Sequence, residues 1–378
     1  MTRFAFGPAR LAAVALALGA VLRAPGLGAQ SLADPEGRAA PQWVQYRVHA
    51  PAEETISELA IPVFVTIPAG SRLTVDVGTA YARAHVASGA LRSDVAGLTD
   101  TQIRGNLTLG DDFVVLTAGV SLPTGRSTIS LDQLAAAGRI GNDFLDFPVS
   151  NMGTGLAATG GVAIARPVGE WSVGAGAAVR RSAAYEPFDI PDETFRYRPG
   201  NEMRARLGAD RPLGAGRLAL GVTYAAFGRD DADGSAYATG DRVIAQGALT
   251  GVIAGQEFTV AAYDLLRAPG FYASGERAGR ENLANLFLSL GMHARGALIE
   301  PSVELRQWLQ DADASEVRSR ASRLATVGVR VRGDIAGLTL YPSAAYTLGS
   351  LAAEDGAGVP VQARLTGFRA GLAAVVSP

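Results

Sequence analysis

An alternation of apolar and polar residues recurs along almost the whole of this chain and most constrains its fold. The clearest example is GLTDTQIRGNLTLGDDFVVLTAGVSLPTG at residues 97–125. Small or apolar residues alternate there with charged or amide residues, which is the period-two pattern of a strand with two different faces. Gly110-Asp111-Asp112 supplies a tight turn, and a second alternating run follows. The segment is predicted to be a β-hairpin.

The same unit is repeated, and we expect about sixteen antiparallel strands, with about twelve as the lower bound. Each run is long enough to cross a bilayer when it is tilted. The predicted strands are residues 43–49, 57–67, 72–86, 98–109, 113–122, 154–166, 171–181, 201–210, 217–227, 242–253, 257–266, 283–293, 296–308, 322–332, 338–348 and 361–376.

The links between these runs alternate between short and long. Short links contain residues such as Pro167-Val168-Gly169 and Ala254-Gly255, whereas long links include residues 87–97 and 123–153. Short periplasmic turns and long outer loops are typical of bacterial outer-membrane barrels, and an even number of strands returns both ends to the periplasm. The spacing therefore favours an up-and-down barrel over a soluble sandwich.

Residues 1–29 have the pattern of a secretory signal peptide, with Arg3 and Arg10 ahead of an apolar run. No later segment is apolar for long enough to form a transmembrane helix, although 48% of the residues are hydrophobic. An exported chain of this kind is predicted to be an all-β, transmembrane antiparallel β-barrel. We expect a short periplasmic segment at residues 30–41, the barrel at 42–378, and a location in the outer membrane of a Gram-negative-type bacterium.

One face of several predicted strands is continuously apolar and should contact lipid. Aromatic residues near the strand ends, including Trp43, Trp171 and Trp308, are expected to form two interfacial girdles. The opposite faces carry charge, which must either pair across a packed interior or line water. The candidate lumen and constriction residues are Arg104, Asp132, Asp143, Asp146, Glu202, Arg204, Arg206, Glu304, Arg306, Arg330 and Arg332.

The long link at 123–153 contains many apolar residues, among them Phe144, Leu145 and Phe147. Such a loop should pack against something rather than extend into solvent. One hypothesis is that it folds into the lumen and sets a constriction, with its acids opposite Arg104. The alternative is a lid packed on the outer rim.

Composition excludes several classes of function. The net charge is −2, and about −5 without the predicted signal peptide, which holds three arginines and no acid. An acidic chain argues against a nucleic-acid partner. There is no cysteine, no lysine for a phosphate-binding loop, and no motif that indicates a metal or cofactor site. His85 and Ser88 could form part of a hydrolase pair, but no third group is evident, so we expect no enzyme activity.

Residues 97–125 also resemble a known family. The resemblance rests on Gly97-Leu98-Thr99-Asp100 and Leu122-Pro123-Thr124-Gly125, two motifs that flank the predicted hairpin. Residues 60–77 also fit the opening hairpin of that family. The pattern is similar to that of the outer-membrane proteins of the MetA pathway of phenol degradation, often grouped with transporters of hydrophobic compounds. The resemblance implies an outer-membrane barrel that passes small molecules, including aromatic ones, and it carries over no catalytic residue.

The function that we predict is a passive outer-membrane channel or transporter for small molecules, hydrophobic or aromatic ones among them. The expected partners are membrane lipid, lipopolysaccharide and a small-molecule solute, and no cofactor is expected. The alternatives are a general porin-like diffusion channel and a plugged barrel with a structural or surface-binding role.

Overall fold

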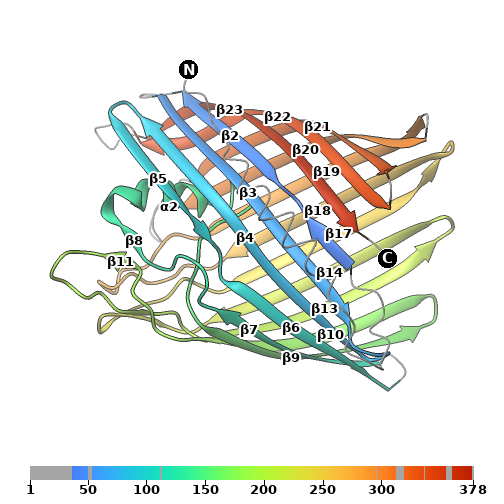
Figure 1. Ribbon diagram of the computed structural model, residues 1–378, viewed down its shortest axis with the longest axis horizontal. Helices are drawn as coiled ribbons and strands as arrows, with labels where there is room; N and C mark the ends of the chain where they lie inside the picture. Colours follow the sequence, from blue (N-terminus) through green and yellow to red (C-terminus); the bar gives the residue numbers. More distant parts are fainter. Residues whose placement is uncertain are drawn as a thin grey trace.

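The computed structural model describes residues 36–49, 53–110, 113–294, 296–311, 319–335, 337–354 and 360–376. These residues form a closed antiparallel β-barrel of sixteen wall strands (Figure 1). The predicted signal peptide lies outside the described residues. The wall strands are β1 (Glu36–Ala39) with β2 (Gln42–His49), β3 (Glu53–Pro68), β4 (Leu73–Ser88), β5 (Leu91–Leu98) with β6 (Thr101–Leu109), β7 (Val114–Leu122), β9 (Ala157–Val168), β10 (Trp171–Ser182), β13 (Glu202–Leu213), β14 (Gly216–Phe227), β17 (Arg242–Ile253), β18 (Gln256–Arg267), β19 (Glu281–Ala294), β20 (Ala297–Asp311), β21 (Ser319–Ile335), β22 (Leu338–Glu354) and β23 (Pro360–Val376).

The first wall strand closes the barrel against the last. Both β1 and β2 pair with β23 on one side and with β3 on the other, in one continuous register. Pro41 separates them because it has no N–H to donate, although its carbonyl still accepts a hydrogen bond from Leu372. Among the described residues, the wall begins at Glu36, ahead of the predicted start at residue 42.

A β-bulge divides the fourth wall strand. Between the pairs Tyr81–Leu98 and Gly78–Gln102, two residues of β4 face three residues of the neighbouring strand. The extra residue shifts the alternation by one, so that the inward side chains have odd numbers in β5 and even numbers in β6. The Thr99 hydroxyl fills the gap in the ladder by accepting the N–H of Ala80 at 2.9 Å.

Strand β5 occupies most of a segment that we predicted to be a long outer link, residues 87–97. The segment lacks the apolar outward face of the other strands because Arg92 and Asp94 stand there, and Gly89 and Ala90 form the tight turn that joins it to β4. The long outer connections are residues 123–156, 183–201, 228–241 and 268–280, which hold the short elements β8 (Ile129–Ser130), β11 (Phe188–Asp189), β12 (Tyr197–Arg198), β15 (Asp230–Ala232) and β16 (Ser235–Tyr237). At the other end the strands are joined by short turns.

The outer surface of the wall is a belt of exposed apolar side chains. The register places Val162, Leu207, Leu220 and Val222 on the outward face of neighbouring strands, and each is exposed. A soluble protein does not expose so continuous an apolar surface, and a membrane-spanning barrel requires one. The belt is the lipid-facing surface.

We predict that adjacent positions of β9 differ in their tolerance of charge. Val162 and Ala163 are both exposed, but Val162 faces lipid and Ala163 faces the lumen. Val162→Arg should lower the free energy of unfolding by about 2–4 kcal/mol, because a charge near the bilayer midplane is costly. Ala163→Arg should change it by less than about 1 kcal/mol, since the lumen is wet. Urea titration in lipid vesicles measures both, and equal losses would contradict the assigned faces.

Candidate functional site

Residues 123–156, here called the inward loop, enter the barrel and contact its wall on two sides. The loop carries β8, a 3₁₀ turn η1 (Leu131–Gln133) and one short helix, α2 (Leu134–Ile140). Helix α2 packs on the inner side of β4 and β5, and it lies within the outline of the barrel in Figure 1. Of the two predicted arrangements, the structure has the loop inside the barrel and not as a lid on its rim.

Asp100 fastens the base of the inward loop to the wall. Its carboxylate accepts hydrogen bonds from the backbone N–H groups of Gly125 at 3.1 Å, Thr154 at 2.7 Å and Gly155 at 2.9 Å. Asp100 belongs to the β-bulge and is buried. Hydrogen bonds to an ionised carboxylate are among the stronger ones in proteins, so both ends of the loop are held at one point.

The two sequence motifs that flank the hairpin meet at this anchor. The Thr124 hydroxyl accepts the N–H of Thr101 at 2.8 Å and donates to the carbonyl of Thr99 at 3.2 Å. A Cβ at Gly125 would overlap the carbonyl of Met152 and the backbone of Asp100. The motif therefore ends in glycine because two backbone segments approach each other closely there.

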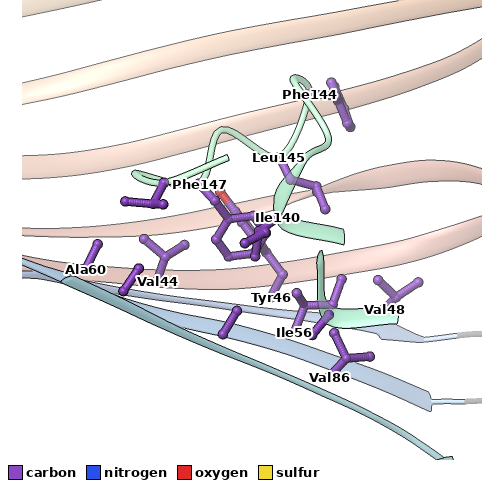
Figure 2. Close-up of a cluster of buried hydrophobic side chains, with 14 of the residues drawn as sticks. Val44, Tyr46, Val48, Ile56, Ala60, Val86, Ile140, Phe144, Leu145 and Phe147 are labelled. Atoms are coloured by element: carbon purple, nitrogen blue, oxygen red, sulfur yellow. The ribbon is translucent and has the colours of Figure 1, made fainter. Parts of the chain in front are cut away.

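The descending part of the loop docks on the first side through apolar contacts. Ile140, Leu145 and Phe147 are buried in one cluster with the inward side chains of β2 to β5 (Figure 2). The Phe147 ring meets the Tyr46 ring edge to face, with centroids 5.4 Å apart. Each fully buried side chain of this size contributes roughly 1.5–3 kcal/mol, so the cluster is a substantial anchor.

A buried serine fixes the start of helix α2 on the same side. The Ser93 hydroxyl donates to the carbonyl of Asp132 at 2.6 Å and accepts the N–H of Ala136 at 3.1 Å. The Asp132 side chain stays local, where it accepts a hydrogen bond from Ser130, and it is exposed. Asp132 therefore does not reach the opposite wall.

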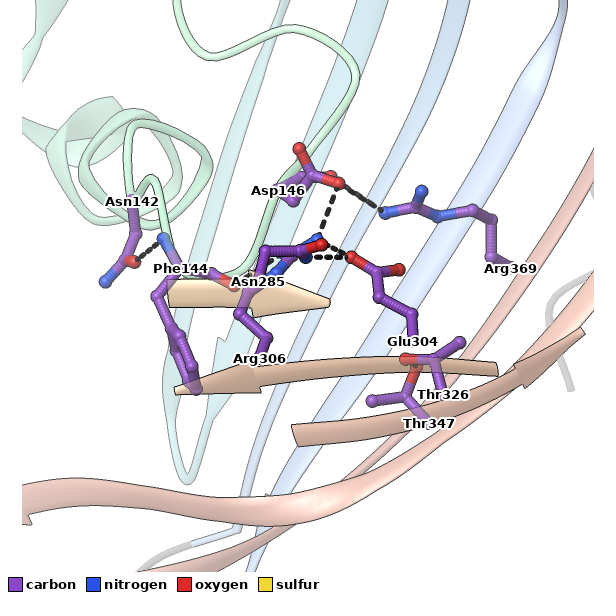
Figure 3. Close-up of polar contacts among 9 residues, drawn as sticks. All are labelled: Asn142, Phe144, Asp146, Asn285, Glu304, Arg306, Thr326, Thr347 and Arg369. Carbon is purple, nitrogen blue, oxygen red and sulfur yellow. Dashed lines mark hydrogen bonds and ion pairs between the residues drawn. The ribbon is translucent and has the colours of Figure 1, made fainter. Parts of the chain in front are cut away.

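The second side of the loop is held by charge. Arg306 of β20 is 7% exposed and donates to the carbonyl of Phe144 at 2.8 Å and to the carboxylate of Asp146 at 3.1 Å (Figure 3). Arg306 also pairs with Glu304. Arg369 of β23 donates to the carbonyl of Asp146 at 2.9 Å. Asp146 has a φ of +54°, a conformation uncommon outside glycine, which these contacts maintain.

Two further contacts complete this second side. Asp143 pairs with Arg267 of β18 at 3.0 Å. The Phe144 ring stacks on Trp308 of β20, with centroids 5.5 Å apart. Trp308 was expected in an interfacial girdle, but the register turns it inward because it shares a face with Arg306. Its position near a strand end was a poor guide, since the girdle requires the outward face as well.

Glu58 of β3 is fully buried beneath the loop. One carboxyl oxygen accepts the N–H of Val149 at 3.0 Å, and the other has no hydrogen-bond partner. Glu58 is another point at which the wall holds the loop backbone. It shares the inward face with Ile56 and Ala60 and alternates with the lipid-facing Leu59 and Ile61, a pattern by which the sequence could have revealed it.

A cavity of about 620 Å³ remains between the loop and the wall formed by β13 to β19. Its walls include the loop residues Asp143 and Asp146 on one side. Arg206, Arg242, Gln246 and several alanines line the other side, together with Tyr263 and Asn285. This volume is in the range of small-molecule sites.

The predicted lumen residues fall into two groups. Asp143, Asp146, Arg206, Glu304 and Arg306 gather around the loop and the cavity. The others lie elsewhere on the inner wall or pair locally: Arg204 with Glu202, Arg330 with Glu300 at 2.7 Å, and Arg332 on the inward face of β21.

Arg104 was expected to oppose the acids of the loop, and this prediction was wrong. Arg104 pairs instead with Asp76 at 2.9 Å, on the adjacent strand β4. Asp76 also accepts hydrogen bonds from Thr66 and Asn106, so Arg104 belongs to a local hydrogen-bond network on the wall. Asp143 and Asp146 of the loop pair with Arg267, Arg306 and Arg369. Of these three arginines, only Arg306 was among the predicted lumen residues.

The hydrolase pair considered from the sequence does not form. His85 and Ser88 are three residues apart in β4, and so their side chains lie on opposite faces of the strand. The imidazole of His85 lies 3.1 Å from Asp94. Within the described ranges, no three His, Asp or Glu side chains are placed to hold a metal ion, and no helix could span a bilayer.

Aromatic side chains also gather in the outer loops. Tyr197 packs between Tyr185 and Tyr237, with centroids 5.6 Å and 5.9 Å away. Burial raises the pKa of Tyr185 to about 12, and burial with hydrogen bonds to Tyr237 and Asp230 raises the pKa of Tyr197. Asp230 accepts the N–H of Gly200 at 2.6 Å, so this cluster joins two loops above the barrel.

Comparisons with known proteins find resemblance at the level of the barrel. No family model matches the sequence, and neither does any curated protein. An outer membrane channel from Pseudomonas putida F1 is 13% identical, with 94% of this chain and 99% of that chain covered and a TM-score of 0.36. OccK11 of Pseudomonas aeruginosa is 12% identical, with 91% and 95% covered and a TM-score of 0.43. Membership of the MetA-related family stays a prediction.

The closed barrel and its apolar belt are the architecture of proteins that span the bacterial outer membrane. The protein is an outer-membrane β-barrel. Strands β1 and β23 pair with each other and help to close the barrel. They pair at the end of the barrel where the short turns lie.

We predict that Arg306→Met loosens the second side of the loop. The change removes a buried partner of Asp146, Glu304 and the Phe144 carbonyl, which should cost about 3–5 kcal/mol. Amide hydrogen exchange of residues 141–150 should accelerate by roughly 100-fold or more. Arg330→Met is the matched control, because the Arg330–Glu300 pair is exposed and worth less than about 1 kcal/mol. An unchanged rate of amide hydrogen exchange in Arg306→Met would contradict the proposal that Arg306 holds the second side of the loop.

Proposed function

We propose that the protein is a passive outer-membrane channel for small molecules, with the inward loop as its constriction. The observation that carries this proposal is the two-sided attachment of the loop. It is fixed to β2–β5 by apolar contacts and to β18, β20 and β23 by arginines, yet a cavity of about 620 Å³ remains beside it. A barrel of about sixteen strands has an aqueous lumen unless something fills it, and the loop fills only part.

The inner wall beside the cavity supports a path for solutes. Many inward residues of β9, β10 and β14 are small, including Gly161, Ala163, Gly176 and Ala219, although Arg180 and Arg217 also face inward. Small side chains leave room on this side of the lumen, whereas the loop occupies the opposite side. The apolar part of the cavity lining fits hydrophobic or aromatic solutes, the class that the family resemblance implies. Membrane lipid and lipopolysaccharide would surround the apolar belt.

The runner-up is a plugged barrel with a structural role. It is favoured by the arginine contacts of the loop, since Arg306 and Arg369 both hold Asp146. A passive channel and a plugged barrel differ in one measurable respect. The channel would show steady ion conductance, and the plugged barrel would not.

We predict a steady single-channel conductance in planar bilayers that increases several-fold when residues 127–151 are replaced by a short Gly–Ser link. This replacement keeps the base of the loop, where the N–H of Arg126 bonds the carbonyl of Met152 and Asp100 holds Gly125. The lumen should widen because the part of the loop that crosses it is gone.

A matched control shortens the tip of the β15–β16 hairpin at residues 232–235, which lies among the outer loops. Its conductance should equal that of the unaltered protein. An absence of conductance in every form would rule out the channel and favour the plugged barrel. Equal conductance with and without residues 127–151 would mean that the loop is not the constriction.

A further inference from the structure

The side of the cavity opposite the loop carries an arginine cluster. The register aligns Arg204 of β13, Ala225 of β14, Arg242 of β17 and Arg267 of β18 in one row across the wall. Adjacent strands are about 4.8 Å apart, so Arg242 and Arg267 are direct cross-strand neighbours. Arg206 lies two residues farther along β13, on the same inward face.

Like charges that face each other across neighbouring strands are unfavourable unless anions compensate them. Arg267 is compensated by Asp143 at 3.0 Å and Glu281 at 3.2 Å. Arg204 is compensated by Glu202. Among the described residues, neither Arg206 nor Arg242 makes an ion pair or a side-chain hydrogen bond.

Arg242 is the more constrained of these two arginines. Its guanidinium lies over the Phe227 ring, 5.2 Å from the centroid, and its Nε is buried without a hydrogen-bond partner. A buried N–H without an acceptor is unfavourable, and a ligand oxygen could satisfy it. Arg206 and Arg242 both line the cavity.

The acids that share the cavity make no ion pair with these two arginines, although the charges of Asp143, Glu202 and Glu281 act on Arg242 from farther away. Asp143 is paired with Arg267, and Asp146 is held by both Arg306 and Arg369. Arg206 and Arg242 therefore lie on the cavity wall without a direct anionic partner among the described residues. A guanidinium binds carboxylate oxygens through two parallel N–H groups.

The remaining lining indicates what else the ligand contains. Ile244, Leu265 and Leu283 face the same cavity, together with Ala219, Ala248 and Ala261. A hydrated inorganic anion would gain nothing from these side chains, whereas an organic acid with an apolar body would bury that body against them.

We propose that Arg206 and Arg242 form a binding subsite for small organic carboxylates with an apolar body. This inference rests on the proposed function, because it names the solute class of the channel. The carboxylate contacts the two guanidinium groups, and the apolar body lies on the alanine and leucine lining. The solute thus replaces the missing anionic partners while it passes the constriction.

The experiment is calorimetric binding of benzoate to the full-length purified protein in detergent, with benzamide, acetate and inorganic phosphate as comparison ligands. Benzoate should bind more tightly than all three, since benzamide lacks the charge and the other two lack the apolar body. Arg206→Gln combined with Arg242→Gln should weaken benzoate binding by at least about tenfold. The corresponding double lysine variant should retain part of the affinity, because it keeps the charge and loses the paired N–H groups.

Arg332→Gln is the matched control, since Arg332 is another inward arginine without a partner among the described residues and lies outside the cavity lining. It should bind benzoate like the unaltered protein. Equal binding of benzoate and benzamide would overturn the proposal, as would stronger binding of phosphate or unchanged binding in the double glutamine variant. Binding does not require conduction, so an Arg-dependent site in a protein that conducts no ions would refute the channel and not the subsite.

Discussion

The carboxylate of Asp100 is the contact on which the arrangement of the lumen depends. It gathers three backbone N–H groups from both ends of the inward loop, and it can do so because the β-bulge moves it out of the regular ladder. Without that point, a loop of more than thirty residues would have a large choice of conformations. With it, both ends of the loop are held next to the wall, and the loop must cross into the barrel.

The two sides of the loop are then held by different physical forces. Apolar burial fixes Ile140 and Phe147 on the first side, and this force is non-directional and little affected by salt. Arg306 fixes the second side through directed hydrogen bonds to Asp146 and Phe144, and these require a defined geometry. A loop attached in this way has a fixed position in the lumen, which is what a constriction needs in order to select between solutes.

Sequence alone predicted about sixteen strands and most of their faces, because burial in lipid on one side and water on the other imposes an alternation along most strands. It predicted that residues 123–153 pack against something, because Phe144, Leu145 and Phe147 are too apolar for solvent. The sequence could not predict which charged side chains pair with each other. Alternation shows that Arg104 faces inward but not whether Asp76 or Asp146 is nearer, since that depends on register and on how far the loop reaches. The bulge at Thr99 and Asp100 was also out of reach, because one extra residue leaves the composition of the segment unchanged.

The small residues of the inner wall and the crowded residues opposite them have one explanation. A loop that occupies one side of a barrel leaves a path only if the facing wall does not extend side chains into it. Gly161, Ala163 and Gly176 meet this condition on β9 and β10, where a larger residue would fill the remaining space. Arg206 and Arg242 belong to a set of inward arginines on β10 to β18, with Arg180, Arg204, Arg217 and Arg267, and they extend long charged side chains beside the loop. Like charges beside the cavity repel each other, and an anionic solute that passes between Arg206, Arg242 and the loop would compensate for this repulsion.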